Sequence, residues 1–373
     1  MSGWKIKEKM VSSLSLSWYL PVSGEGRTLL AGESDAGGVA RRPPTLGYLR
    51  QIAMAADQLG FDSILVPTDT GCEDPWVVSS ALAGSTERVR FLIAIRPGLI
   101  APTLLAQMAA AFQRISGNRL LLNVVTGAQG PEMLRFGDHL GKDERYARTV
   151  EYLDVMRGTW DGSPFSYRGT YYDVQDAIVV DPPRWPQVYF GGASPAALPV
   201  AARHADTYIM FGEPPTQTEA RIAALRAVVD AEGRAMPRLS VRFHVVTRPT
   251  GAEAWEAAYH ILDGATDELI AATQQAMSRE QAVGEQQMHA LVQDLVQDRE
   301  KLEVYPNLWA GIGLLRRGAG TALVGSYQEV ADRIAEYHSL GVDSFVLSGY
   351  PNLEEAYQVG EGVMPALAAR GLM

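Results

Sequence analysis

Two kinds of segment alternate along this chain: short runs rich in apolar and β-branched residues, and longer stretches with apolar residues at helical spacing. Residues 46–58 are of the second kind, because Leu49, Ile52, Ala53 and Ala56 fall on one helical face. Strands that alternate with helices are typical of βα units, and eight such strands favour an α/β fold, a (β/α)8 TIM barrel. The predicted strands are residues 14–20, 63–67, 90–96, 119–126, 188–191, 207–212, 239–248 and 344–349.

Two of the predicted helices begin with polar residues that can cap a first turn. Ser326 is followed by Glu329 at the spacing of a capping box, and Thr216 precedes Glu219 at the same spacing. We therefore expect helices to begin directly after Ser326 and Thr216.

The alternation is interrupted between the seventh predicted strand, which ends near Arg248, and the eighth. Roughly ninety residues lie there, where one helix is the usual connection. Residues 251–277 and 278–302 are polar and helical in pattern, so we predict a helical insertion over about 250–325 on the carboxyl-terminal face, where barrel active sites are built. A solvated helical pair used for contacts between subunits is the alternative.

The insertion ends in a glycine-punctuated run, residues 307–325, that fits neither helix nor strand periodicity and is predicted to be a loop. It places Arg316 and Arg317 between apolar segments, with Gly318 and Gly320 just after them. An arginine in such a loop has little structural role, so we expect Arg316 to meet a ligand and the loop to be a mobile lid. Arg317 is expected to be solvated.

The composition is that of a globular protein, with 47% hydrophobic and 20% charged residues in 373. A net charge of −10 argues against a nucleic-acid groove or an anionic membrane surface as partner, because both need a basic face. An anionic substrate would have to be attracted by local arginines. We expect residues 1–12 to be a flexible leader and residues 13–373 to form a single barrel domain.

A single cysteine, Cys72, excludes an internal disulfide and a multi-cysteine metal site, and it fits a reducing compartment. The sequence shows no signal-peptide core and no apolar run of ~18 residues, so a cytoplasmic protein is expected. It also lacks a dinucleotide fingerprint, a phosphate loop, a zinc-protease motif and a nucleophile elbow. No metal is expected, since the six histidines, at 139, 204, 244, 260, 289 and 338, lack the spacing of a metal triad.

Polar residues stand where the predicted strands end, and side chains at those ends converge on a barrel mouth. Strand two leads into residues 69–76, strand three ends at Arg96, strand four ends in 123–127 and strand five in 191–194. Strand seven contains Arg242 and His244, which alternate to the same face. An arginine and a histidine can therefore share one pocket.

Several motifs, in this order along the chain, resemble those of the flavin-dependent alkanesulfonate monooxygenases, members of the bacterial-luciferase-like superfamily. The resemblance runs from about Trp18 to Met364, and the motifs are specific only in combination. They are residues 71–74 (GCED), 123–127 (NVVTG), 144–146 (ERY), 189–192 (YFGG), 211–215 (FGEPP), 307–325 and 343–351.

The resemblance implies a TIM barrel that receives reduced FMN as a co-substrate from a separate NAD(P)H-dependent FMN reductase. The implied reaction uses O2 to convert an organosulfonate into an aldehyde and sulfite, in a homodimer or homotetramer. The same chemistry on methanesulfonate, on a sulfosugar such as sulfoquinovose, or on a sulfone is an alternative. From another class, the chain could be a flavin- or deazaflavin-binding barrel without monooxygenase activity.

The resemblance also implies roles for single residues, and the chemistry of their side chains agrees. Arginine forks suit the oxyanion of a sulfonate, and backbone N–H groups in a glycine-rich turn before a helix suit a phosphate. The implied catalytic group is His244, Arg242, Arg316 on the mobile loop, Tyr350 after strand eight, and Cys72 near the flavin. The implied flavin contacts are Asn123, Thr126 and Tyr146, with a phosphate-binding turn formed by Gly191, Gly192, Ala193 and Ser194.

Several of these roles have a structural alternative. Cys72 also fits a small buried side chain, because no neighbour in sequence visibly lowers its pKa. His244 also fits a hydrogen-bonded core histidine, and Tyr350 a residue that closes the barrel. The chain departs from the family pattern at Ser23, where alkanesulfonate enzymes tend to have histidine, and over residues 28–43. These departures leave the substrate more open than the type of reaction.

Overall fold

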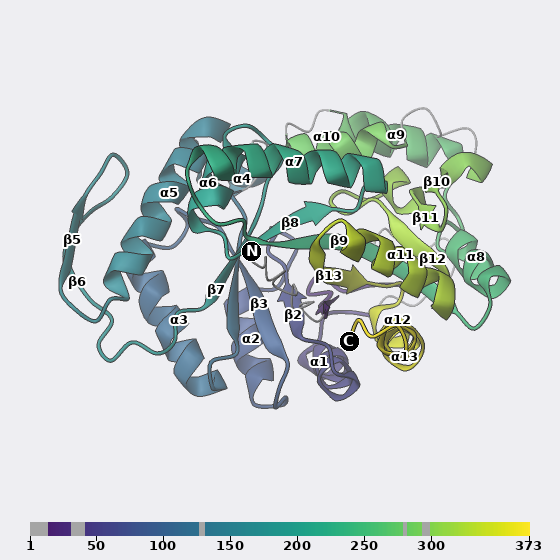
Figure 1. Ribbon diagram of the computed structural model, residues 1–373, viewed down its shortest axis with the longest axis horizontal. Helices are drawn as coiled ribbons and strands as arrows, with labels where there is room; N and C mark the ends of the chain where they lie inside the picture. Colours follow the sequence, from purple (N-terminus) through teal and green to yellow (C-terminus); the bar gives the residue numbers. More distant parts are fainter. Residues whose placement is uncertain (1–13, 31–41, 127–130, 279–281, 293–298) are drawn as a thin grey trace, which may run out of the picture.

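The computed structural model describes residues 14–30, 42–126, 131–278, 282–292 and 299–373, and the predicted leader over residues 1–12 lies outside them. Eight parallel strands close into a barrel with helices between them, so the predicted (β/α)8 TIM barrel is confirmed (Figure 1). In order around the barrel, the strands are β1 (Ser15–Tyr19), β2 (Ser63–Val66), β3 (Arg90–Ile95), β4 (Leu120–Val124), β7 (Gln187–Gly191), β8 (Thr207–Phe211), β9 (Arg238–Arg248) and β13 (Val342–Ser348), which returns to β1.

Helices connect the strands and cover the outside of the barrel (Figure 1). The predicted capping box is present, since the Ser326 hydroxyl accepts from the amide of Glu329 at 3.3 Å. The predicted cap at Thr216 is wrong, because the helix begins at Pro215 and places Thr216 inside its first turn. These helices are α1 (Leu46–Leu59), α2 (Pro75–Ala83), α3 (Pro102–Ser116), α4 (Pro131–Arg135), α5 (Lys142–Thr159), α6 (Ala197–His204), α7 (Pro215–Ala231), α11 (Tyr327–Ser339), α12 (Asn352–Gln358) and α13 (Met364–Ala368).

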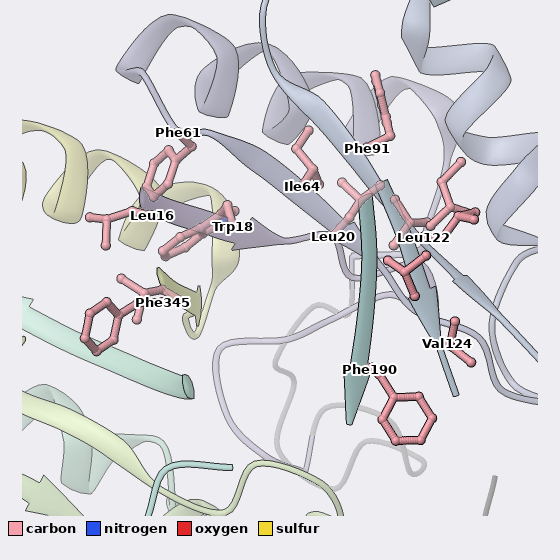
Figure 2. Close-up of a cluster of buried hydrophobic side chains, with 14 of the residues drawn as sticks. Leu16, Trp18, Leu20, Phe61, Ile64, Phe91, Leu122, Val124, Phe190 and Phe345 are labelled. Atoms are coloured by element: carbon pink, nitrogen blue, oxygen red, sulfur yellow. The ribbon is translucent and has the colours of Figure 1, made fainter. Parts of the chain in front are cut away.

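Strand β1 shows how the barrel buries both of its faces. Leu16 and Trp18 point toward the surrounding helices, and the Trp18 ring lies 5.0 Å from the ring of Phe61, centroid to centroid (Figure 2). Tyr19 alternates to the other face, as strand geometry requires. There it packs against an interior cluster made of Leu65, Leu92, Leu121, Tyr189 and Val346.

Strand β9 is long and changes its partner halfway along its length. As far as Arg242 it pairs with β8, where Phe211 stands opposite Arg242. From His244 onward the same edge pairs in parallel with β12 (Ala322–Ser326), and the amide of His244 donates to the carbonyl of Thr321 at 2.9 Å. The barrel and the insertion therefore meet at the two residues that the sequence singles out on this strand.

The insertion between β9 and β13 contains helices, as predicted, but its glycine-rich end differs from the prediction. Its helices are α8 (Gly251–His260), α9 (Asp267–Met277) and α10 (Val283–Ala290). At the opposite end of the molecule lies a hairpin that the strand prediction missed, formed by β5 (Phe165–Arg168) and β6 (Asp173–Ala177) (Figure 1). The predicted loop over 307–325 is only partly a loop, because β11 (Leu308–Trp309) pairs antiparallel with β12 after a short β10 (Glu303–Tyr305).

Backbone geometry explains why strands form in this glycine-rich run. Asn307 adopts a φ of +61° at the turn from β10 to β11, a conformation that asparagine tolerates. Gly313 donates its amide to the carbonyl of Gly320 at 2.8 Å, and a Cβ on Gly313 would stand only 3.3 Å from that oxygen. The glycines thus permit two backbone segments to approach closely between β11 and β12. In the described ranges no helix combines the length and apolarity needed to cross a membrane.

Candidate active site

The middle of β9, the end of β13 and the insertion bring four of the implied catalytic residues close together. His244 is buried, and its ring stacks on that of Tyr350 with 5.4 Å between centroids and 29° between planes. Tyr350 follows β13 directly and accepts a hydrogen bond from Nη1 of Arg316. Arg242 lies two residues before His244 on the same face of β9.

The imidazole of His244 is held from the barrel side by Ser348, whose Oγ lies 2.9 Å from Nδ1. Burial lowers the pKa of His244 well below its ordinary value, and the positive charges of Arg242 and Arg316 lower this pKa further. His244 is therefore a neutral imidazole at neutral pH.

Arg316 reaches the mouth from the insertion, on the short segment between the turn Gly311–Leu314 and β12. Its guanidinium carbon lies 5.6 Å from the centroid of the Tyr350 ring, in addition to the hydrogen bond with the hydroxyl. Burial raises the pKa of Tyr350, although Arg316 opposes the shift. Because Arg316 donates to the phenol oxygen, the proton of that phenol is left to point toward a ligand.

Arg242 is supported by an aromatic ring on β1, which lies on the other side of β13 from β9. Its guanidinium carbon lies 4.6 Å from the ring centroid of Tyr19 at the end of β1, and its Nε is buried without a hydrogen-bond partner. Burial lowers the pKa of Arg242, as does Arg316 to a smaller extent, but an arginine stays protonated in proteins. The mouth therefore holds two guanidinium cations.

Cys72 lies near this group, half-buried in the loop after β2. Burial raises the pKa of its thiol to about 11, and the carboxylates of Asp69 and Glu132 raise it too, against smaller opposing effects of Arg316 and Arg96. A thiol in this environment is protonated at neutral pH and is not an activated nucleophile. A position beside the flavin stays a prediction.

The implied flavin contacts gather on the other side of the mouth, around the turn that joins β7 to α6. A Cβ on Gly192 would lie 3.3 Å from the hydroxyl of Tyr146, which comes from α5, and the carbonyl of Gly192 accepts from Tyr208 at 2.7 Å. Among the described residues, none accepts a hydrogen bond from the amides of Gly192, Ala193 or Ser194. These three consecutive backbone N–H groups, beside the hydroxyl of Tyr146, are suitable donors for a phosphate.

Asn123 lies at the end of β4 and Thr126 just beyond it, on the side of β7 that faces away from β8. Asn123 shares a face with Leu121 of the interior cluster, so it points inward near the mouth. Thr126 is buried, with its Oγ1 3.4 Å from Oγ1 of Thr149 on α5. The residues that the sequence assigned to a flavin therefore come from two paired strands, β4 and β7, and from α5 beside them, and their role as the wall of an FMN site stays a prediction.

Two residues at the mouth were missed by the sequence analysis. Tyr19 supports Arg242, and Ser348 contacts His244. Both stand at the carboxyl end of a predicted strand, which is the signal that could have identified them. Arg96, also at a strand end, is already paired with Glu132 and with the carbonyl of Thr68.

Comparison with known proteins identifies the family of this chain and solved structures with a similar fold. Residues 25–344 match the family described as luciferase-like monooxygenase. Riboflavin lyase, solved with modified FMN and the substrate riboflavin, is 21% identical with a TM-score of 0.79, over 96% of this chain and 92% of that one. EDTA monooxygenase from Chelativorans sp. BNC1 is 19% identical with a TM-score of 0.76, over 97% and 95%. Long-chain alkane monooxygenase is also 19% identical, with a TM-score of 0.77 over 97% and 92%.

Proposed function

This chain belongs to the luciferase-like monooxygenase family, and on that premise we propose that it is a two-component, FMNH2-dependent organosulfonate monooxygenase. It would receive reduced FMN from an NAD(P)H-dependent reductase and use O2 to release sulfite from a sulfonate, leaving an aldehyde. The observation that carries the proposal is the convergence of Arg242 and Arg316 at the barrel mouth, beside His244 and Tyr350.

The two arginines account for the choice of an anionic substrate. In the described part of the chain neither guanidinium forms an ion pair with a carboxylate, and the groups that act on their charges are Tyr19, Tyr350, Cys72 and each other. Two cations without a counter-ion in a half-buried site favour an anion strongly. Sulfonate oxygens are good acceptors for the paired N–H groups of a guanidinium.

Tyr350 and His244 would position or exchange protons at the same group. The phenol of Tyr350 is protonated at neutral pH, and its proton is free to be donated to a substrate oxygen. His244 is neutral, so it can accept a proton or hold one without adding a third positive charge. The site therefore offers donors at the oxyanion and one uncharged base beside them.

The wall from Asn123 to Ser194 would hold reduced FMN, with the phosphate at the amides of Gly192, Ala193 and Ser194. When bound, reduced FMN supplies the electrons that activate O2 for transfer of one oxygen atom to the substrate. The chain's own contribution is to place the sulfonate against the flavin and to exclude water, which would otherwise divert O2 consumption to hydrogen peroxide. The segment that bears Arg316 stands where a lid would do this.

A sulfite assay tests the proposal. Purified protein would be supplied with FMN, a generic flavin reductase, NADH and a panel of sulfonates in air, and sulfite measured colorimetrically. Sulfite release from at least one sulfonate is expected, and Arg242→Ala should remove it, since losing such a contact in a dry site costs roughly 2–5 kcal/mol. His244→Ala should also abolish release, whereas Arg317→Ala serves as the matched arginine control.

The outcome separates the alternatives. Substrate-dependent O2 uptake without sulfite would point to another oxygenation, such as that of a sulfone. An absence of any substrate-dependent O2 uptake, with tight flavin binding, would mean a binding barrel and would overturn the proposal. Anaerobic fluorescence titration should show tighter binding of reduced than of oxidised FMN.

A further inference from the structure

Tyr19 occupies a position at the mouth that its sequence context does not explain. It is half-buried at the carboxyl end of β1, and one side of it packs on the apolar cluster inside the barrel. Its ring lies under the guanidinium of Arg242, 4.6 Å from ring centroid to guanidinium carbon. The aromatic ring is thus placed between the core and a cation.

The support of Arg242 differs from that of two other part-buried arginines, Arg148 and Arg248. Arg148 pairs with Asp138 at 2.5 Å, and Arg248 pairs with Glu355 at 2.6 Å. For Arg242 no such carboxylate is found in the described residues, and its Nε is buried without a partner. A carboxylate would neutralise the cation, whereas the ring of Tyr19 attracts the cation and its hydroxyl, which accepts a hydrogen bond from the guanidinium, leaves the positive charge in place.

The hydroxyl of Tyr19 also belongs to the mouth. Its oxygen accepts a hydrogen bond from Arg242, which leaves the phenol proton to be donated elsewhere, and the phenol also acts on the pKa of Arg316 and of Tyr350. Tyr19 therefore adds a hydroxyl donor to the two guanidinium groups. An anion with three oxygens can present a separate oxygen to each of these three groups, whereas a carboxylate must share its two oxygens among them.

We propose that Tyr19 is a specificity-determining residue, whose ring holds Arg242 in place for an anionic head group and whose hydroxyl donates to a third oxygen of that group. The proposal rests on the proposed function, because it assumes that the anion between Arg242 and Arg316 is the substrate. The ring and the hydroxyl of Tyr19 would thus contribute separately to the binding of the anion.

Two substitutions distinguish the contributions. Tyr19→Phe keeps the ring and removes the hydroxyl, and Tyr19→Leu removes both. Tyr259→Phe, at an exposed tyrosine of α8, is the matched control. Each protein, saturated anaerobically with reduced FMN, would be titrated with 1-hexanesulfonate and with hexanoate in a calorimeter. Circular dichroism and the affinity for reduced FMN establish that the variants are folded.

For Tyr19→Phe, the dissociation constant of hexanesulfonate should rise about tenfold while that of hexanoate stays within about twofold of the parent, the effect of one lost hydrogen bond to a charged group. For Tyr19→Leu, both constants should rise, because Arg242 loses its support. The sulfonate-to-carboxylate preference is a readout that a merely structural tyrosine would not alter.

Three results would contradict these expectations. Parent-like affinity for hexanesulfonate in both Tyr19 variants would overturn the proposal, as would an equal loss for both ligands in Tyr19→Phe. A parent protein that binds neither anion would overturn it as well. If the parent binds hexanoate but not hexanesulfonate, both the proposed function and the role of the Tyr19 hydroxyl are refuted. If, in addition, Tyr19→Leu binds hexanoate as the parent does, the role of the Tyr19 ring is refuted too.

Discussion

At the scale of single residues, the contact between Ser348 and His244 decides which nitrogen of the imidazole carries a proton. Ser348 Oγ lies 2.9 Å from Nδ1, and the backbone carbonyl of Ala319 acts on the same ring as a hydrogen-bond acceptor. Because a carbonyl can only accept, we predict that the ring proton lies on Nε2 and that Nδ1 accepts from the serine. His244 is in this way bonded to the barrel on one side and to the insertion on the other.

Ser348→Ala should remove the preference of His244 for this tautomer. Without the serine hydroxyl, Nδ1 has no donor, and a mixture of tautomers is expected together with a fall of about tenfold in sulfite release. Two-bond 15N–1H correlation spectra of the imidazoles would detect the change, with His244→Gln used to assign the signal. Ser348→Thr should keep the parent tautomer, and Ser344→Ala, four residues earlier on the same face of β13, is the control. An unaltered His244 spectrum in Ser348→Ala would refute the assignment.

The sequence could place some of these side chains and not others. Strand alternation alone predicts that Arg242 and His244 share a face, and the structure brings both to the mouth with Tyr350 and Arg316. The contact of Tyr19 with Arg242 depends on how β1 and β9 flank β13 in the closed barrel, which no local pattern encodes. Contacts between strands that are distant in sequence are therefore the part of the site that could not be predicted from the sequence.

At the scale of elements, hydrogen bonds from α9 of the insertion hold the segment that carries Arg316. The amide nitrogen of the buried Gln274 donates to the carbonyls of Gly313 and Leu314, at 2.9 and 2.8 Å. On the other side, Thr321 is fixed by its bonds with Gly212 and with the amide of His244. Gly318 is held as well, because its amide donates to the carboxylate of Glu285 at 2.9 Å, so the part of the predicted lid between these anchors shortens to residues 315–317.

Gln274→Met should loosen this segment. The substitution keeps the length of the side chain but removes both donors, so two buried carbonyls lose their partners. Limited trypsin digestion should then cut at Arg316 or Arg317 several times faster than in the parent, and reduced FMN with a sulfonate should slow the cut. Gln275→Met, at an exposed position of the same helix, is the control. Equal cleavage rates in the parent and both variants would mean that α9 is not the anchor.

Regular elements were predictable because their patterns are local, whereas the short strands were not. All eight barrel strands were anticipated from apolar runs bounded by turns, yet β12 was taken for loop because its five residues lie in a glycine-rich run. Its pairing with β9 is made by a segment about eighty residues away in sequence. Such a strand is defined by its partner more than by its own composition.

At the scale of the whole molecule, a buried carboxylate makes stability depend on pH. Glu355 of α12 is fully buried beside Arg248, and burial raises the pKa of its carboxyl group to about 7 despite that arginine. The folded protein therefore binds this proton more tightly than the unfolded chain does. The contribution of Glu355 to stability is complete below the ordinary pKa of a glutamate and is lost as the pH rises through about 7.

Glu355→Gln should remove this dependence. Between pH 6 and pH 8 the parent should lose about 1 kcal/mol through Glu355, which lowers the midpoint of thermal unfolding by about 1–2 °C. The variant should lack that part of the decline. Glu354→Gln is the matched control, since Arg42 lowers the pKa of Glu354, which is already charged over this range. Identical pH profiles for the parent and Glu355→Gln, measured by calorimetry, would show that burial does not govern this carboxyl group.

The exchange of partners along β9 has a consequence for the design of chimeric enzymes. Because β12 continues the barrel's own hydrogen-bond ladder from His244 to Arg248, the insertion is not a module that can be cut out at its two ends. A graft from a relative would bring its own β12 and would set a new register against the recipient's β9. Specificity could therefore be transferred between members of the family only by moving β9, the insertion and β12 as one block, with junctions placed before Arg238 and after Ser326.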